Sequence, residues 1–310
     1  MFSLSLGNSS SKYFNYTTMR KFEAKRMCAG SVIAKRLLVL VAAMALTGCA
    51  AFQPTAVNGP TANLPPYPIA QAEMGNRLEE ASQAWYQLSQ HYGLPGKTEA
   101  KLNPYTATLE GLPANLPAPI YLPKVGSQTN PTEEQMRESL RRFIVEWQRL
   151  IGADPNQLSL VERTDEPSGV KLARYEQRPF RYPLRGGFGN LTIRFRSDWQ
   201  LIAFSSNCIP NADRIQATLN TLTPKVTNEQ AVNHIKTQPL TFADANGQQQ
   251  TLSLPANATV EARQLVVYAQ PSKDASSGLQ IRLAWELEVT GGPVTRVYLD
   301  AISDEIIATS

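Results

Sequence analysis

The side chains that could do chemistry in this 310-residue chain are few and widely spaced. The histidines, His91 and His234, are 143 residues apart, and neither lies in an H-E-x-x-H sequence, so they give no metal-site spacing. Cys208 with His234 could act as nucleophile and base, but only residue type supports this pairing. Glu286 and Glu288 are expected on one strand face and could act as paired carboxylates. No G-x-S-x-G sequence occurs. We therefore expect no enzyme, no cofactor and no metal. We interpret Cys208 as a small core residue, both histidines as structural, and the two glutamates as a solvated strand face.

Cys49 differs from the other cysteines in the residues that precede it. Lys35 and Arg36 are followed by nine strongly apolar residues, 37–45, and then by Leu46-Thr47-Gly48. A membrane-spanning helix needs roughly 20 apolar residues, whereas a signal peptide has about 7–15 after a basic flank. The order resembles a bacterial lipoprotein signal peptide with its lipobox. The alternatives are a spanning helix, an ordinary secretory signal and a buried core helix. The resemblance implies cleavage before Cys49, lipid addition to the Cys49 thiol, and a mature protein that carries palmitate.

This signal peptide, residues 1–48, changes how charge and location are interpreted. The whole chain has a formal charge of +4, but residues 1–48 hold seven Lys or Arg against one Glu. They carry +6, which leaves −2 for the part from Cys49 onward, so the basic excess does not indicate a nucleic-acid partner. The resemblance, with Ala50 after Cys49, favours a lipoprotein of the cell outer membrane facing the periplasm. We also hypothesise that residues 1–26 reflect a misplaced start.

Two helices and two proline-rich stretches are expected before the first sheet. Five prolines predict an extended tether over residues 49–69. An apolar stripe predicts a helix from Ala70 to Tyr92, either docked on the core or forming a coiled-coil seam with a partner. The stripe consists of Met74, Leu78, Ala81, Trp85, Leu88 and Tyr92. Residues 97–128 are interpreted as an extended connector on the surface, so that residues 70–129 comprise helix and connector. A second helix is expected from an Asn130 cap to Gly152. Its stripe is Met136, Leu140, Phe143, Trp147 and Leu150.

From residue 171 the apolar pattern changes to a period of two, which predicts strands. Strands over 171–178, 190–196 and 200–206 would form an antiparallel meander, with a glycine turn at 186–189. Arginines on these strands alternate with aromatic residues, and both types are enriched at protein interfaces. The cluster is either a solvated sheet face or a partner surface. The candidate partner surface consists of Arg174, Tyr175, Arg178, Phe180, Tyr182, Arg194 and Arg196.

The pattern of a helix followed by a meander then repeats. Thr227 and Gln230 form a capping box that predicts a short helix. The strands that follow are expected at 262–269, 279–290, 294–300 and 305–308. The sequence therefore predicts an α+β fold. It consists of two helix-plus-antiparallel-meander units, residues 130–212 and 222–310, after the signal, the tether and an extra helix.

The second unit resembles a PepSY domain. The matching residues are Trp285 in the strand 283–289, the strand end Asp300-Ala301 and the last strand with Ile306-Ile307. The upstream unit has a helix ending at Leu150-Ile151-Gly152 and the strand 173–177. It resembles the fungalysin/thermolysin propeptide (FTP) motif, which accompanies PepSY in propeptides of thermolysin-type metalloproteases.

The resemblance implies binding rather than catalysis. Such propeptide domains contact a protease, assist its folding and block its active site. No protease domain follows in this sequence, so we expect a lipid-anchored envelope protein acting in trans. It would bind, inhibit or chaperone an exported protease or another envelope protein. The alternative is a structural or assembly lipoprotein with helix 70–92 as an oligomerisation helix. The expected partners are the membrane, through lipid on Cys49, and such a protein.

Overall fold

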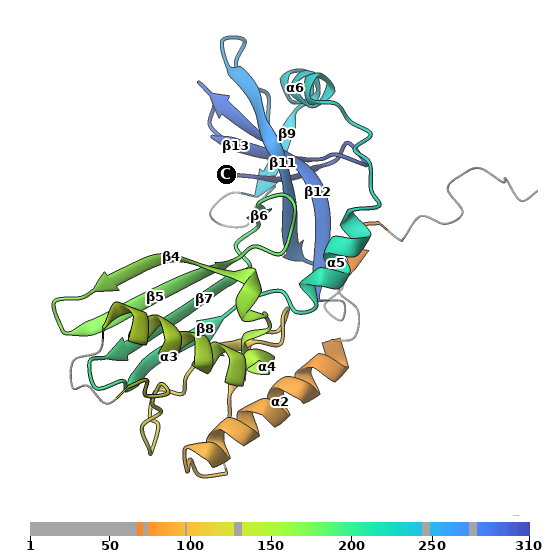
Figure 1. Cartoon of the computed structure of the whole chain (residues 1–310). Coiled ribbons are helices and arrows are strands. Elements are labelled where there is room, and N and C mark those ends of the chain that lie inside the picture. Colours follow the sequence, from red (N-terminus) through yellow and green to blue (C-terminus); the bar gives the residue numbers. More distant parts are fainter. Residues whose placement is uncertain (1–66, 71–73, 97, 127–131, 244–248, 273–277) are drawn as a thin grey trace, which may run out of the picture. The chain divides into compact units, whose positions relative to one another are not determined.

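The computed structural model describes residues 67–310 apart from 71–73, 97, 127–131, 244–248 and 273–277 (Figure 1). The predicted signal peptide, Cys49 and most of the predicted tether lie outside these residues. The described residues belong to one compact unit that spans 63–310. Their five α-helices and mostly antiparallel sheets confirm the α+β class. None of the described helices is long and apolar enough to cross a membrane.

Helix α2 (Met74–His91) buries the middle of its predicted stripe inside the protein. Ala81, Trp85 and Leu88 are at most 5% exposed, and Trp85 and Leu88 belong to the largest core cluster. Leu78 is instead 39% exposed. The apolar spacing of the stripe is therefore largely explained by intramolecular packing, which leaves little of it for a coiled-coil seam.

The prediction of a surface connector over 97–128 is wrong for much of that stretch. It contains the short strands β2 (Lys101–Leu102) and β3 (Leu109–Gly111), and Leu109, Ile120 and Leu122 are at most 2% exposed. The N–H of Leu201 donates to the Ile120 carbonyl at 2.8 Å, so this stretch also pairs with an outer strand. Prolines remove periodicity from a sequence, but the apolar residues between them still gain free energy from burial.

A four-stranded antiparallel sheet follows, in the order β4-β5-β7-β8. Its strands are β4 (Leu158–Asp165), β5 (Val170–Gln177), β7 (Asn190–Arg196) and β8 (Leu201–Ser206). Only β4 was not predicted, because a register shift between Leu160 and Glu162 interrupts its alternation. The short 3-10 helix η1 (Pro155–Gln157) leads into β4.

Helices α3 (Glu133–Glu146) and α4 (Gln148–Ile151) pack on one face of this sheet (Figure 1). All five predicted stripe residues are buried, as expected. The predicted cap is wrong: Thr132, not Asn130, caps α3, because its side chain accepts from the Gln135 N–H in a capping box. Gly152 ends α4 with φ +79°, in the left-handed region.

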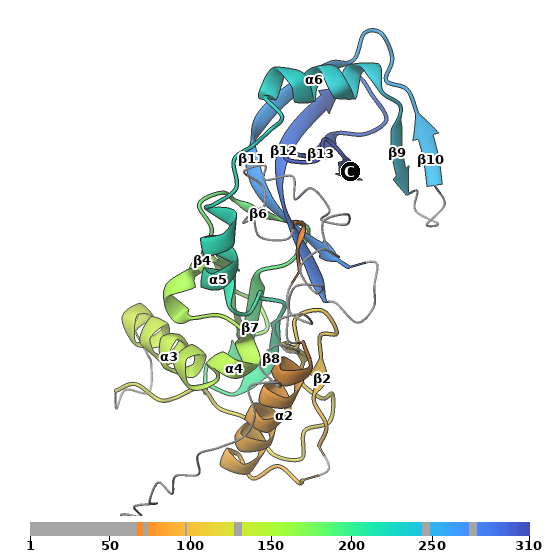
Figure 2. The ribbon, with the colours of Figure 1, turned by 90° about the vertical axis from the view of Figure 1, so that its right-hand side faces the viewer.

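The C-terminal sheet has the order β14-β13-β12-β11-β6. The meander consists of β11 (Thr259–Pro271), β12 (Leu279–Thr290), β13 (Arg296–Asp300) and β14 (Ile306–Thr309). The predicted strands therefore exist, although β13 starts two residues later than expected. Helices α5 (Ala212–Leu219) and α6 (Asn228–Thr237) pack on it through apolar clusters, and α6 lies across β11 and β12 (Figure 2). Thr227 and Gln230 form the predicted capping box.

Two strands join this sheet from distant parts of the chain. β6 (Leu184–Arg185) forms a parallel pair with β11, and β1 (Ile69–Ala70) forms an antiparallel pair with β12. The tether prediction is therefore wrong at its end, where Ile69 is a buried strand residue. A separate hairpin of β9 (Leu240–Ala243) and β10 (Gln249–Leu252) completes the described elements. Neither β1, β6, α5 nor this hairpin was predicted.

Candidate functional site

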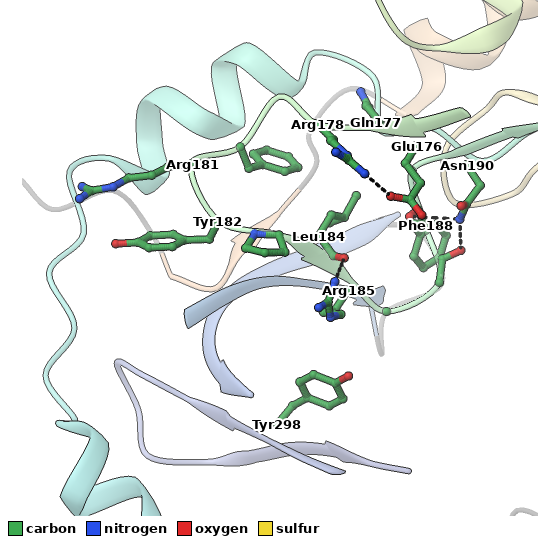
Figure 3. A pocket seen from close by; sticks show the side chains of 15 residues that line it. Glu176, Gln177, Arg178, Arg181, Tyr182, Leu184, Arg185, Phe188, Asn190 and Tyr298 are labelled. Carbon is green, nitrogen blue, oxygen red and sulfur yellow. Dashed lines mark hydrogen bonds and ion pairs between the residues drawn. The ribbon is translucent and has the colours of Figure 1, made fainter. Parts of the chain in front are cut away.

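A cavity of about 650 Å³ lies along the segment that links β5 to β7 and that contributes β6 to the C-terminal sheet (Figure 3). Most of the residues from 176 to 190 line it, and Tyr298 of β13 contributes from the other sheet. This volume is within the range typical of ligand-binding clefts. The cavity is therefore the candidate functional site.

The ends of the 176–190 segment are held by polar contacts. The side-chain amide of Gln177 donates to the Ile209 carbonyl at 2.9 Å and accepts from the Ile209 N–H at 2.7 Å. The backbone N–H of Gln177 donates to the Gly189 carbonyl at 2.7 Å, which closes the loop at its base. The chain can therefore leave β5, cross to the other sheet and return to β7 in a defined conformation.

Gly186 allows the segment to reach β11. Its φ is +97°, and a Cβ there would lie 1.8 Å from the Ala269 carbonyl oxygen. A side chain at this position would both strain the backbone and collide with the strand. The predicted glycine turn at 186–189 exists, but its first glycine also allows the segment to lie close to the backbone of β11.

Arg185 anchors the segment through a buried carboxylate. Its Nε donates to Oε1 of Glu286 at 2.9 Å and its Nη2 to Oε2 at 3.2 Å. The Glu286 side chain is 6% exposed, and it also accepts from Gln264 at 2.8 Å and from the Tyr298 hydroxyl at 3.3 Å. Burial alone would raise the pKa of Glu286, but the hydrogen bonds from Arg185 and Gln264 outweigh burial and lower it.

The prediction of a solvated face for the two glutamates is wrong for Glu286. Glu288 behaves as expected: it is half exposed and pairs with Arg263 at 2.6 Å. The two carboxylates therefore bind different arginines and do not form a shared pair. The alternation of β12 could not reveal this difference, because what covers Glu286 comes from β6, about 100 residues earlier in the chain.

The predicted partner surface is divided by the structure. Arg178, Phe180 and Tyr182 line the cavity, whereas Tyr175 is 8% exposed and packs in the core beneath α3 and α4. Burial raises the pKa of Tyr175 to about 12. One aromatic member of the predicted surface is therefore structural.

The other three arginines lie along β5 and β7 outside the cavity and have polar partners. Arg174 pairs with Glu162 at 3.1 Å, and Arg194 pairs with Glu166 at 2.6 Å. Arg196 donates to the side chain of Gln200 at 3.1 Å. The two ion pairs offset part of the positive charge of the arginine-rich strands, which reduces the case for a uniformly cationic face.

The charged groups of the cavity are only partly neutralised. Arg178 pairs with Glu176 at 3.1 Å, with both side chains about half exposed. Arg181 is exposed and lies 5.4 Å from the ring centroid of Tyr182, a cation–π geometry. Within the part of the chain that the structure describes, Arg181 forms no ion pair.

The chemistry-bearing residues elsewhere have structural surroundings. Cys208 is fully buried in the core, and burial raises the pKa of its thiol to about 12, as expected for a core residue. His234 Nδ1 lies 2.9 Å from a carboxylate oxygen of Asp304, and His91 Nδ1 lies 3.9 Å from one of Glu146. Among the described residues, no group of three or more His, Cys, Asp or Glu could hold a metal.

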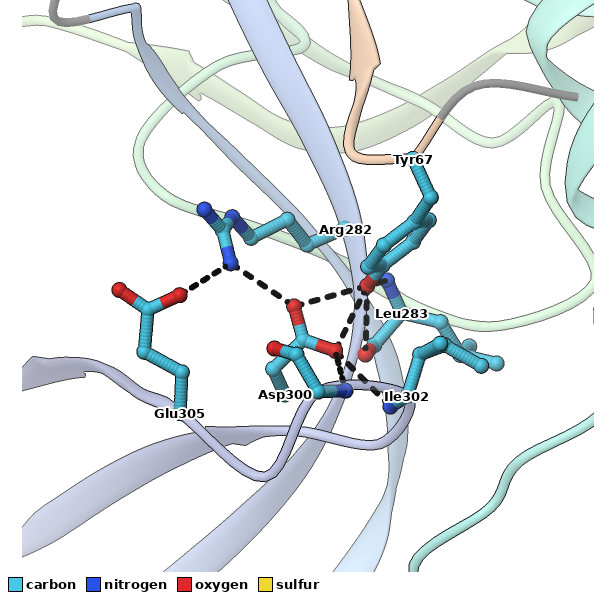
Figure 4. A network of polar contacts seen from close by, with 7 residues as sticks. Tyr67, Arg282, Leu283, Asp300, Ile302 and Glu305 are labelled. Atoms are coloured by element: carbon cyan, nitrogen blue, oxygen red, sulfur yellow. Dashed lines mark hydrogen bonds and ion pairs between the residues drawn. The ribbon is translucent and has the colours of Figure 1, made fainter. Parts of the chain in front are cut away.

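A polar network around Asp300 was not predicted (Figure 4). Its carboxylate is fully buried and accepts from the Tyr67 hydroxyl at 2.8 and 2.9 Å and from Arg282 at 2.9 Å. The Leu283 N–H donates to the same hydroxyl at 3.1 Å, and the Ile302 N–H donates to Asp300 at 2.8 Å. Burial and the neighbouring carboxylate raise the pKa of Tyr67. The network joins the end of the predicted tether to the sheet.

No protein-family profile matches the sequence, and no curated protein matches it. Among solved structures, the Bacillus megaterium YpeB C-terminal domain is similar over 75% of this chain and 97% of its own. The identity is 12% and the TM-score 0.25. No function follows from a likeness at this TM-score.

Proposed function

We propose that this chain is a lipid-anchored, non-catalytic binding protein of the cell envelope. It holds an exported protease, or another envelope protein, in trans in the manner of a protease propeptide. Its two α+β units are of the FTP and PepSY kinds. The lipid is carried by Cys49, and the folded part faces the periplasm from the outer membrane.

The observation that carries the proposal is the composition of the cavity. Among the described residues that line it are three arginines and four aromatic residues. Arginine and tyrosine are the types that most often dominate binding energy at interfaces. Its one carboxylate within the described residues, Glu176, is paired with Arg178 rather than poised for proton transfer. A site of this composition suits recognition better than catalysis.

The sequence motifs of the PepSY resemblance have structural roles that support the proposal. Trp285 donates its indole N–H to the Val226 carbonyl at 2.9 Å, which ties the meander to the start of α6. Asp300 accepts from the backbone N–H groups of Ile302 and Ser303, which forms the turn before β14. These residues hold the scaffold together and do not line the cavity, which leaves the segment 176–190 to contact the partner.

The oligomerisation alternative has less support. Trp85 and Leu88 of α2 are buried in the protein's own core, and Tyr86, which is 56% exposed, is not part of the buried stripe. A monomer in light scattering of the lipid-free chain from Ala50 is the expected result. A stable oligomer that Tyr86→Ala dissociates would favour the alternative instead.

The proposed binding is tested by affinity capture from envelope extracts with the mature protein, with an assay of exported metalloprotease activity in parallel. We expect one enriched exported protein, and a loss of its capture when Arg181 and Tyr182 are both replaced by alanine. Arg174→Ala is the matched control because Arg174 lies outside the cavity. Capture of nothing above background, together with no effect on protease activity, would reject the proposal.

The anchor is tested separately by labelling cells with a palmitate analogue and fractionating their membranes. The chain should be labelled and should float with outer-membrane vesicles, and Cys49→Ser should abolish both. Unchanged labelling in that variant would rule out lipid on Cys49.

A further inference from the structure

The cavity has an apolar surface and a cationic surface, which would bind an apolar group and an anionic group of a ligand. Phe180, Tyr182 and Phe188 are half-buried and form an aromatic wall with Leu184. Arg181 lies beside Tyr182 at one end, and Arg178 lies nearer the other end, beside Glu176 (Figure 3). An apolar wall with cations at its rim matches the usual anatomy of a protein interface.

The net charge of the lining residues indicates the charge of the ligand group that the cavity would bind. The described lining residues include three arginines and one carboxylate, an excess of two positive charges. Arg185 is already held by the buried Glu286 and Arg178 is paired with Glu176, whereas Arg181 forms no ion pair with any residue that the structure describes, so its guanidinium has the most unused hydrogen-bonding capacity. A planar guanidinium offers donors arranged to bind a carboxylate.

Arg181 is also partly preorganised. Its backbone N–H donates to the Gln216 side chain of α5 at 3.1 Å, and its guanidinium rests near the Tyr182 ring. The segment behind it is fixed by the Arg185–Glu286 pair and by the contact of Gly186 with β11. Less conformational entropy is therefore lost when a ligand binds.

We propose that this cavity binds an extended peptide segment of the partner that carries a carboxylate next to an aromatic or large aliphatic side chain. The carboxylate contacts Arg181 at the rim, and the apolar side chain packs against the wall of Phe180, Tyr182 and Phe188. This inference rests on the proposed function, since it assigns the chemistry that the binding module recognises.

The test uses the full mature protein and an array of short synthetic peptides. Across the array, Asp or Glu is placed next to each apolar residue type in turn. Each acidic peptide has a counterpart in which Asn or Gln replaces the acidic residue. We expect binding to be restricted to acidic peptides with a neighbouring aromatic or leucine side chain. For these, Arg181→Gln should weaken binding about tenfold or more, the factor that one hydrogen bond between charged groups contributes. Arg174→Gln removes an equivalent charge outside the cavity and should change nothing.

Two further variants keep the result interpretable. Arg181→Lys should retain part of the affinity, because it keeps the charge but loses the planar fork. Tyr182→Leu should weaken binding most for the peptides in which an aromatic residue is next to the acidic residue. Thermal melting checks that each variant is folded, which the exposed position of Arg181 favours.

Three results would overturn the inference: no peptide is bound, amide counterparts bind equally well, or Arg181→Gln has no effect on the acidic peptides. These failures differ from a failure of the proposed function. If envelope capture yields a partner whose binding ignores Arg181→Gln, the binding function stands and the carboxylate recognition does not. If acidic peptides bind but no partner is captured, the carboxylate recognition stands and the proposed binding of an envelope protein does not.

Discussion

Replacing Glu286 with glutamine should destabilise the protein by about 2–3 kcal/mol, on the scale of hydrogen bonds to charged groups. Glu286 accepts two hydrogen bonds from Arg185 and one from Gln264, and its side chain is 6% exposed. Removing one member of a fully buried ion pair costs about 3–5 kcal/mol. The Arg185 side chain is 32% exposed, so water can partly solvate it once the charge of its partner is gone. The expected loss of unfolding free energy is therefore about 2–3 kcal/mol rather than the value for a fully buried pair.

The Arg185→Gln variant should cost at least as much, because it leaves the more buried member of the pair as an unneutralised carboxylate. The double variant should be less destabilised than the sum of the two single variants, because the second substitution removes a charge that has already lost its partner. This non-additivity identifies the direct contact, since two unrelated destabilised sites would give additive changes.

The same pair predicts a dependence of stability on pH. The hydrogen bonds lower the pKa of folded Glu286, so the unfolded chain binds the proton more tightly. The stabilisation is therefore fully present above the unfolded pKa of about 4.3, and it is lost as pH falls through the lower folded pKa. Below that window, the wild-type protein and Glu286→Gln should approach the same stability.

Urea unfolding of the lipid-free chain from Ala50, followed by the fluorescence of its four tryptophans, measures these changes. Glu288→Gln is the matched control, because Glu288 is about half exposed and should lose less than about 1 kcal/mol. Equal effects of the two substitutions at neutral pH, or additive single variants, would refute the role assigned to the Arg185–Glu286 pair.

Three further predictions concern the backbone, the tether end and the core. Gly186→Ala should destabilise the protein clearly more than Gly187→Ala: both have positive φ, but only at Gly186 would a Cβ collide with the Ala269 carbonyl, as thermal melting should show. Tyr67→Phe should cost about 2 kcal/mol in urea unfolding, because a fully buried carboxylate and a strand N–H lose a hydrogen-bond partner. Cys208 should resist alkylation in the native protein and react on unfolding, since burial keeps its thiol protonated and inaccessible.

Each of these predictions has an outcome that contradicts it. Equal melting temperatures for the two glycine variants would mean that the segment can move away from β11. A change for Tyr67→Phe no larger than for the exposed control Tyr86→Phe would mean that the tether end is not part of the folded body. Stoichiometric alkylation of the native protein would place Cys208 at the surface.

The local elements were predictable from the sequence wherever one periodicity was uninterrupted. The stripe from Met136 to Leu150 and the alternation in residues 190–196 correspond to α3, α4 and β7. Thr227 and Gln230 identified the start of α6, because a capping box depends on residues three positions apart. The proline-rich residues 97–128 carried no period, so their burial could not be foreseen.

The candidate site was only partly predictable. The sequence singled out Arg178, Phe180 and Tyr182 by residue type, and these residues line the cavity. It also grouped them with Arg174 and Arg194, which the structure places outside the cavity and pairs with glutamates. Whether an arginine is free depends on its cross-strand or loop neighbours, and no sequence period encodes those.

The sequence by itself determined the α+β class, the pattern of helices followed by meanders and the capping box of α6, because each depends on residues within a few positions of one another. The lipid attachment at Cys49 and the FTP and PepSY identities remain predictions of the sequence. Only the tertiary structure decided that β6 and β1 join the C-terminal sheet, that Glu286 is a buried anchor, and that a cavity forms at residues 176–190. These features depend on contacts between residues more than 80 positions apart. Long-range packing, rather than local propensity, therefore creates the site.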